Sequence, residues 1–224
     1  MVASASAPML AYSASAMPGV YRTEIRLPNA PGIPSIPWVV SNPIYVGMAT
    51  PAAAPTSGQP HATRVVSVYA DGPAVNWRVE RNERSQGSLS VVPSVGGTQI
   101  SLRYGIGGTV SEGPYVAMAV ASGPGLAGAD RLTFMGRAVR PMRLSVQLRA
   151  PQPTEDKRWS RSVYLDETAR IITVFFDELR PAGSATGPPA LADVRDILWV
   201  VDTVNAQPGS SGQIWLDDVQ YVVR

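Results

Sequence analysis

The residue types that carry most enzyme chemistry are scarce or badly spaced in this chain. It contains no cysteine and one histidine, His61, which excludes thiol catalysis, cysteine-bound metals and any site built from two imidazoles. His61 stands among prolines and small residues, where a solvated loop position is expected. Carboxylates occur as neighbours, such as Asp177 and Glu178, and neighbouring strand residues point to opposite faces. No single pair therefore forms the two-carboxylate site of a glycosidase, and we predict a protein that is not an enzyme.

Two glycine-containing segments also lack the context that catalytic motifs need. The segment GIGGTV at 105–110 is followed by no helix, so it fails as a nucleotide-binding fingerprint. The segment GSSG at 209–212 lacks the G-x-S-x-G spacing of a nucleophile elbow. Both segments are expected to be turns or strand ends.

One acidic pair near the C-terminus suits a metal ion. Asp217 and Asp218 offer the hard oxygen ligands that calcium prefers, and loop carbonyls would complete the shell. A structural calcium ion at this position is one hypothesis, and no other cofactor is predicted. The alternative is that both carboxylates hydrogen-bond the backbone of a turn.

The segment 142–150, MRLSVQLRA, alternates between apolar and polar side chains, which predicts a strand with one buried face. A second such segment, WSRSVYLDE at 159–167, turns Tyr164 and two serines away from Val163 and Leu165. Trp159 and Arg161 have the parity of Val163, so they lie near the strand end or follow a bulge.

A sheet face with these polar groups fits either of two hypotheses. It is an ordinary solvated face, or it is a shallow groove for a polyhydroxylated ligand, since sugars need planar donors and acceptors together with aromatic faces. Under the second hypothesis, the ligand-binding residues are Tyr104, Gln147, Arg149, Trp159, Arg161 and Tyr164.

Those segments belong to a long series of predicted strands separated by turn residues. The chain has 224 residues, of which 45% are hydrophobic, with 20 glycines and 21 prolines. Short strands without sustained helical periodicity indicate an all-β, antiparallel sandwich or barrel. The strands are expected at 64–69, 76–82, 87–93, 98–106, 114–121, 131–139, 142–149, 159–167, 170–177, 195–202 and 212–223, with one helical turn near 189–195.

Two of the predicted properties concern partners. The net charge is +2, and no run of five like charges occurs, so nucleic-acid binding is not expected. No apolar run approaches the length of a membrane-spanning helix.

The segment 170–177 is apolar on both faces, which predicts either a central strand or a strand with an exposed Phe.

The first sixty residues differ from the rest in composition. Residues 1–19 have no Lys or Arg and are expected to be a flexible tail, with no secretory signal recognised and the compartment left open. Residues 20–46 predict a short extended or β segment, and residues 47–62 a Pro/Ala-rich linker before a domain at 63–224.

The segment 21–46 resembles the C-terminal end of PHP-type metal-dependent phosphoesterases. The resemblance lies in Tyr21, Arg22, Pro37, Trp38, Ser41, Asn42, Pro43, Ile44 and Tyr45. It implies that the chain is the accessory C-terminal part of a PHP-like hydrolase with an upstream catalytic domain. The catalytic metal ligands of that family lie upstream, so no catalytic residue is assigned here.

The segment 64–224 resembles a galactose-binding-like jelly-roll domain of the carbohydrate-binding-module type. The resemblance lies in LRYGIG (102–107), RLTFMGRA (131–138), RLSVQLR (143–149), RWSRSVYLD (158–166) and the ending at 197–222. It implies a jelly-roll β-sandwich, non-catalytic carbohydrate binding, a calcium ion within the sandwich, and a secreted or periplasmic location. The remaining alternative is a structural or assembly sandwich that forms a homo-oligomer.

Overall fold

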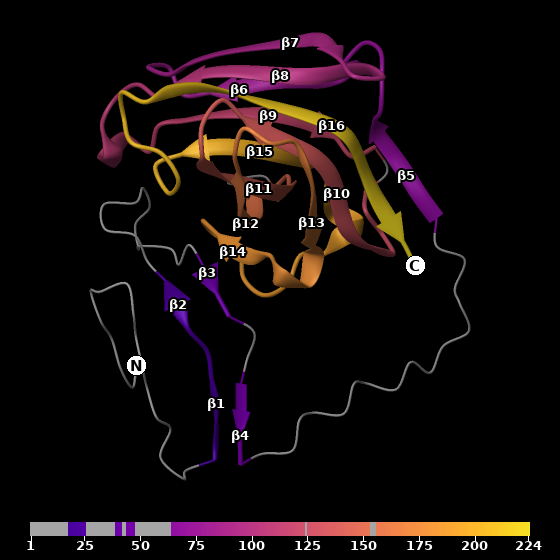
Figure 1. Cartoon of the computed structure of the whole chain (residues 1–224). Helices are drawn as coiled ribbons and strands as arrows, with labels where there is room; N and C mark the ends of the chain where they lie inside the picture. The colour runs from indigo at the N-terminus through magenta and orange to yellow at the C-terminus, as the bar shows by residue number, and fades with distance from the viewer. Residues whose placement is uncertain (1–17, 26–38, 42–43, 48–63, 124, 153–155) are drawn as a thin grey trace. The chain divides into compact units, whose positions relative to one another are not determined.

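The computed structural model describes residues 18–25, 39–41, 44–47, 64–123, 125–152 and 156–224. The predicted tail before residue 18, the predicted linker and His61 lie outside the described residues. The described residues fall into two units, at 18–47 and 64–224. Each unit is described by itself below (Figure 1).

The N-terminal unit consists of two short antiparallel pairs. Strand β1 (Gly19–Tyr21) pairs with β4 (Ile44–Val46), and β2 (Glu24–Ile25) pairs with β3 (Val39–Val40). The backbone N–H of Thr23 donates to the Ser41 hydroxyl at 2.9 Å, and the N–H of Ser41 donates to the Thr23 carbonyl at 2.9 Å. Extended pairing therefore occurs within the segment where the sequence predicts it.

The C-terminal unit is a sandwich of two antiparallel sheets. The first, here called the β16 sheet, has the order β13–β10–β16–β8–β7, and β5 pairs with the last residues of β16 (Figure 1). Its strands are β5 (Arg64–Tyr69), β7 (Gln86–Ser94), β8 (Gly97–Gly105), β10 (Ala129–Ala138), β13 (Arg170–Phe175) and β16 (Ser211–Val223).

The second sheet, here called the β11 sheet, has the order β14–β12–β11–β15–β9–β6. Its strands are β6 (Trp77–Arg81), β9 (Tyr115–Ala121), β11 (Met142–Ala150), β12 (Lys157–Leu165), β14 (Arg180–Ala182) and β15 (Asp196–Asp202). Three 3-10 turns complete the described part: η1 (Val110–Glu112), η2 (Phe176–Glu178) and η3 (Leu191–Asp193). In that part, no helix is long and apolar enough to cross a membrane.

The predicted all-β sandwich is confirmed. Each of the predicted strands has a counterpart, and the predicted helical turn is η3. Strand β14, which contains Pro181, escaped prediction because it pairs over three residues at a sheet edge. Strand β13 also lies at an edge, so the central-strand interpretation is wrong, and the Phe175 side chain is exposed, as the other interpretation expected.

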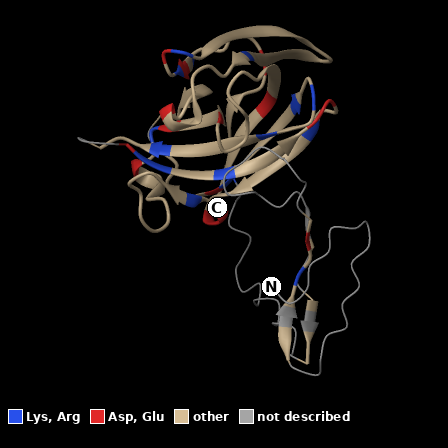
Figure 2. Ribbon diagram, turned by 90° about the vertical axis from the view of Figure 1, so that its left-hand side faces the viewer, with Lys and Arg blue, Asp and Glu red and all other residues tan. Residues whose placement is uncertain are grey.

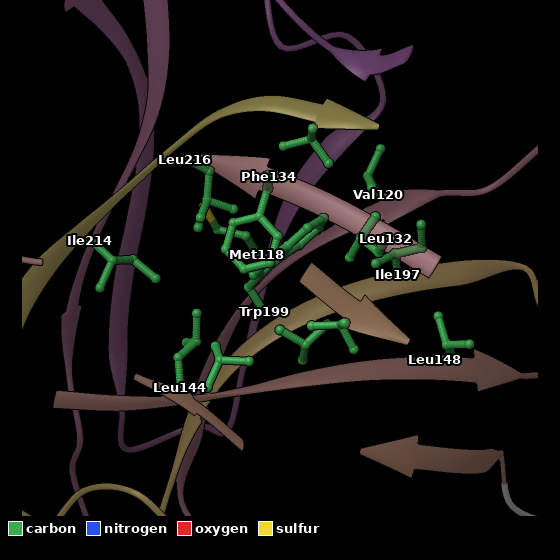
Figure 3. Packing of buried hydrophobic residues seen from close by; sticks show 14 of the residues in the cluster. Met118, Val120, Leu132, Phe134, Leu144, Leu148, Ile197, Trp199, Ile214 and Leu216 are labelled. Atoms are coloured by element: carbon green, nitrogen blue, oxygen red, sulfur yellow. The ribbon is translucent and has the colours of Figure 1, made fainter. Parts of the chain in front are cut away.

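The core lies between the two sheets and follows directly from the alternation of side chains. Leu144 and Leu148 of β11 point inward, as predicted, and are fully buried. Trp199 of β15 stacks on Trp77 at a centroid distance of 5.2 Å and meets Phe134 of the β16 sheet edge-on at 5.7 Å. Figure 3 shows Trp199, Phe134 and Met118 at the centre of the cluster of buried side chains. The indole therefore ties both sheets to one core.

Candidate functional site

Alternate residues of the β11 sheet point away from the core and form its outer face. The strand register arranges them in rows across the sheet. Gln147 lies opposite Ser160 of β12 and Leu198 of β15, and Ser145 lies opposite Ser162. The β11–β12 half of this face is therefore rich in hydroxyl and amide groups. We call the set of Ser145, Gln147, Ser160, Ser162 and Tyr164 the polar face.

The β15–β9 half of the same face is apolar. Its four central side chains form a second hydrophobic cluster, distinct from the core, and are 0–3% exposed: Ala117, Ala119, Leu198 and Val200. Tyr115, at the start of β9, packs against them. The outer face thus combines an apolar floor with a polar strip beside it.

Above this floor, four charged side chains from β6, β11 and β15 form a network that we call the arginine lattice. Arg149 donates from Nη1 and Nη2 to the two carboxylate oxygens of Glu80, at 2.7 and 2.8 Å. Its Nε donates to Asp196 at 2.9 Å. Arg78 bonds the same two acids, Glu80 at 2.9 Å and Asp196 at 2.8 Å.

The lattice keeps its charges in place. Hydrogen bonds from Arg149 lower the pKa of Glu80. Burial by itself would raise the pKa of Asp196, but hydrogen bonds from Arg78 and Arg149 outweigh it and lower that pKa. Hydrogen bonds to Glu80 and Asp196 in turn raise the pKa of Arg149. Both acids are therefore ionised at neutral pH, and the donors of Arg149 point at them.

The small residues of β9 make room for this bridge. In the sheet, β15 and β9 lie between β11, which carries Arg149, and β6, which carries Glu80. Ala119 and Ala117 stand on the outer side of β9, opposite Arg78 and Glu80. Their methyl groups leave space for the long side chains that meet across the strand.

At the other end of the outer face, Asn205 joins two strands. Its Nδ2 donates to the Ser145 hydroxyl at 2.6 Å, and its Oδ1 accepts from Ser162 at 2.8 Å. Asp202 lies beside it, and burial raises the pKa of this carboxyl. These bonds fix the two serine hydroxyls of the polar face in one orientation.

Gln147 stands at the centre of the polar face with an unused acceptor. The side chain is 7% exposed, and its Oε1 is buried without a hydrogen-bond partner among the described residues. Buried polar atoms nearly always have a partner, so this oxygen lacks a donor, as Thr133 Oγ1 and the core Trp199 Nε1 also lack partners among the described residues. Tyr164 lies on the same face, opposite Arg143.

Of the six predicted ligand-binding residues, Gln147, Arg149 and Tyr164 share this face. Trp159 points the other way: it is 2% exposed in the core, and its indole N–H donates to the Gly187 carbonyl at 2.8 Å. The β11–β12 register is regular, so no bulge turns Trp159 outward. Arg161 has the same inward parity and pairs with Glu178 at the edge of the sandwich.

Tyr104, the remaining predicted residue, belongs to the other sheet. It lies on β8 with its ring in the core, and its hydroxyl is 3.4 Å from the Met142 sulfur. The six residues therefore do not form one surface. The residue types suit sugar binding, but Tyr104 and Trp159 pack in the core and Arg161 pairs with Glu178 at the sandwich edge.

Asp217 and Asp218 occupy an irregularity in β16. Asp218 has a φ of +46°, and the pairing with β10 shifts register at this position, as in a bulge. The Asp217 carboxylate accepts the Asp218 N–H at 2.8 Å. Across the described ranges, no three acidic or histidine side chains gather as a metal site. Calcium at Asp217 and Asp218 stays a prediction.

The charged residues of the sandwich are distributed over many of its strands and turns (Figure 2). This distribution explains why Glu80, Arg78 and Asp196 were missed as partners of Arg149. Glu80 is 69 residues from Arg149 in the sequence, and Asp196 is 47 residues away. No local spacing signals such a contact, and only knowledge of the strand order could have found it.

No protein-family model matches the chain, and no curated protein matches its sequence. Solved structures do match. The family 11 carbohydrate-binding module of the cellulosomal cellulase Lic26A-Cel5E of Clostridium thermocellum superposes with a TM-score of 0.58 at 15% identity, covering 72% of this chain and 95% of that one. The family 11 module from the same organism in complex with a β-1,3-1,4-mixed-linked tetrasaccharide gives 0.56 at 15% identity, over 71% and 94%.

A family 30 carbohydrate-binding module is also similar, with a TM-score of 0.53 at 12% identity, covering 72% of this chain and 99% of the other. At these identities the likeness concerns the fold: the chain has the β-sandwich fold found in carbohydrate-binding modules. The resemblance of residues 21–46 to PHP-type enzymes is supported by none of these comparisons and stays a prediction.

Proposed function

We propose that this protein is a non-catalytic carbohydrate-binding module whose ligand lies on the polar face of the β11 sheet. The observation that carries the proposal is the buried, unpartnered Oε1 of Gln147, set among the hydroxyl groups of Ser145, Ser160 and Ser162. Sugar hydroxyls supply the donors and acceptors that complete such a surface. The similarity of the fold to known carbohydrate-binding modules supports the same class of ligand.

The arrangement divides the work between two groups of residues. In this proposal, Gln147 and the serines hydrogen-bond the sugar, and Tyr164 offers the aromatic face that packs on its C–H side. Arg149 acts as a positioning residue, because its donors already point at Glu80 and Asp196. Because Ser145 and Gln147 are only 5% and 7% exposed, few polar atoms of this face are open to a ligand, and modest affinity is expected.

The test is affinity electrophoresis through gels that contain mixed-linked β-glucan, xylan or mannan. Gln147→Ala and Tyr164→Ala are each expected to weaken binding to the retained polymer about tenfold, the value of one or two lost hydrogen bonds or stacking contacts. Thr173→Ala, an exposed change on the other sheet, is the matched control. Unchanged retardation of both folded variants would refute the assignment of this face.

A further inference from the structure

The end of the β16 sheet contains a hollow of about 440 Å³ whose charges the proposed sugar site does not use. Arg81 and Arg103 line it together with polar groups from Gln86, Ser88 and Ser211. None of its lining residues is acidic. We call this feature the basic hollow. Its composition favours an anion over a neutral ligand.

The positive charges at the basic hollow are not neutralised by the protein. Arg81 Nη1 donates to the main-chain oxygens of Ser85 at 2.8 Å and of Asn82 at 3.3 Å, and these acceptors carry no net charge. The Arg103 side chain is exposed and makes no hydrogen bond or ion pair with any described residue. Both guanidinium groups therefore keep their full charge beside the hollow.

A third guanidinium stands close to the same lining. Arg140 donates to the main-chain oxygen of Ser211, again a neutral acceptor. Arg81 and Arg103 thus line the hollow, and Arg140 bonds the main chain of a further lining residue, Ser211.

The outer face of the β16 sheet continues this feature. Gln213 lies opposite Arg103, and its Nε2 donates to Ser101 at 2.7 Å. Trp215 follows on the same face of β16, with the guanidinium of Arg137 3.7 Å from its ring centre. The first carboxylate, on Asp217, comes only after the indole. The strip from the basic hollow to Trp215 therefore combines cationic, amide and aromatic groups.

We propose that this strip is a second binding site and that it takes an acidic saccharide, with a uronate or sulfate group in the basic hollow and sugar rings along Gln213 and Trp215. The planar fork of arginine matches a carboxylate or sulfate with paired hydrogen bonds. Trp215 is half-buried and Arg137 covers one face of its ring, so the part of the indole that remains exposed would supply the apolar surface for a pyranose ring. This inference rests on the proposed function only for its choice of carbohydrate as the ligand class.

The test uses the full chain and isothermal titration with polygalacturonate and dextran sulfate as probes. Arg103→Gln is expected to weaken binding of the better probe about tenfold or more, since it removes charged hydrogen bonds. Arg180→Gln is the charge-matched control: the Arg180 side chain is exposed on β14 and has no hydrogen bond or ion pair with a described residue. It is expected to change affinity by less than about twofold.

The outcomes separate this site from the polar face. An equal loss in both arginine variants would show general charge attraction and overturn the proposal. Saturation by inorganic sulfate alone, or tighter binding of a single-stranded oligonucleotide, would overturn the choice of a saccharide. If Gln147→Ala leaves polygalacturonate binding intact while Arg103→Gln removes it, the second site is supported. This result would hold even if no neutral glucan binds, in which case the proposed function fails by itself.

Discussion

At the scale of single residues, the outer face of the β11 sheet depends on how a few charges are paired. Arg149 is the central case, because it contacts two acids that lie on different strands. Its type suggested a ligand-binding role, which stays a prediction, and the structure shows its donors bonded to Glu80 and Asp196. Gln147, two residues earlier on the same strand and the same face, is the opposite case, since its amide oxygen has no described partner.

Replacing Arg149 by Met is expected to lower the free energy of unfolding by about 2 kcal/mol, because Glu80 and Asp196 would remain partly buried without their main partner. The measurement is urea unfolding at pH 7, with Arg180→Met as the exposed control. The lowered pKa values of Glu80 and Asp196 mean that wild-type stability declines as the pH falls below about 4. The variant should lose less on acidification, and an equal acid loss would contradict the lattice.

Asp202 has the opposite effect on how folding stability changes with pH. Burial raises the pKa of its carboxyl, so the folded protein holds this proton more tightly than the unfolded chain does. Stability therefore decreases as the pH rises through the folded pKa. Asp202→Asn keeps an acceptor for the Val204 N–H and is expected to be more stable than the wild type at pH 7. The gain should shrink toward pH 4 in thermal melts, and a gain independent of pH would argue against this interpretation.

At the scale of elements, the small alanine side chains of β9 leave space for the long side chains of the arginine lattice. Ala119→Leu is expected to destabilise the protein by about 1–3 kcal/mol, because the larger side chain would occupy the space beneath the arginine lattice. Ala121→Leu is the matched control, since it lies on the same strand and face but is exposed. Both variants would be compared by thermal unfolding. A similar effect of the two changes would show that crowding at Ala119 is not specific.

The elements also show where sequence reasoning succeeds. Alternation in 142–150 predicted correctly which side chains of β11 enter the core, because successive strand residues point to opposite faces of the sheet. Trp159 and Tyr104 were assigned to the site by type, and the parity that places them in the core was visible for Trp159. The partners of Arg149 could not be predicted from the sequence, because contacts between strands far apart in sequence depend on strand order.

At the scale of the whole molecule, the two sheets share one core through Trp199. The ring contacts Trp77 within its own sheet and Phe134 of the other. Trp199→Ala is expected to lower the free energy of unfolding by about 3–5 kcal/mol, through lost burial and a cavity that both sheets line. Circular dichroism and fluorescence should still report one transition.

Val95→Ala is the control for that measurement, because Val95 lies fully exposed in the β7–β8 turn. Its effect is expected to stay within about 0.5 kcal/mol. Separate transitions for the two probes in the Trp199 variant would show that the sheets unfold independently. A loss below about 1 kcal/mol would show that the indole is not the tie between them.

The arginine lattice has a consequence for how this surface could change over time. The four lattice residues, which lie on β6, β11 and β15, are constrained as a set, because a change in one leaves the charge of another without its partner. The serines of β12, by contrast, belong to no such network apart from the link between Ser162 and Asn205. New ligand preferences would therefore arise by mutation along β12, while the half of the outer face that carries the arginine lattice stays unchanged.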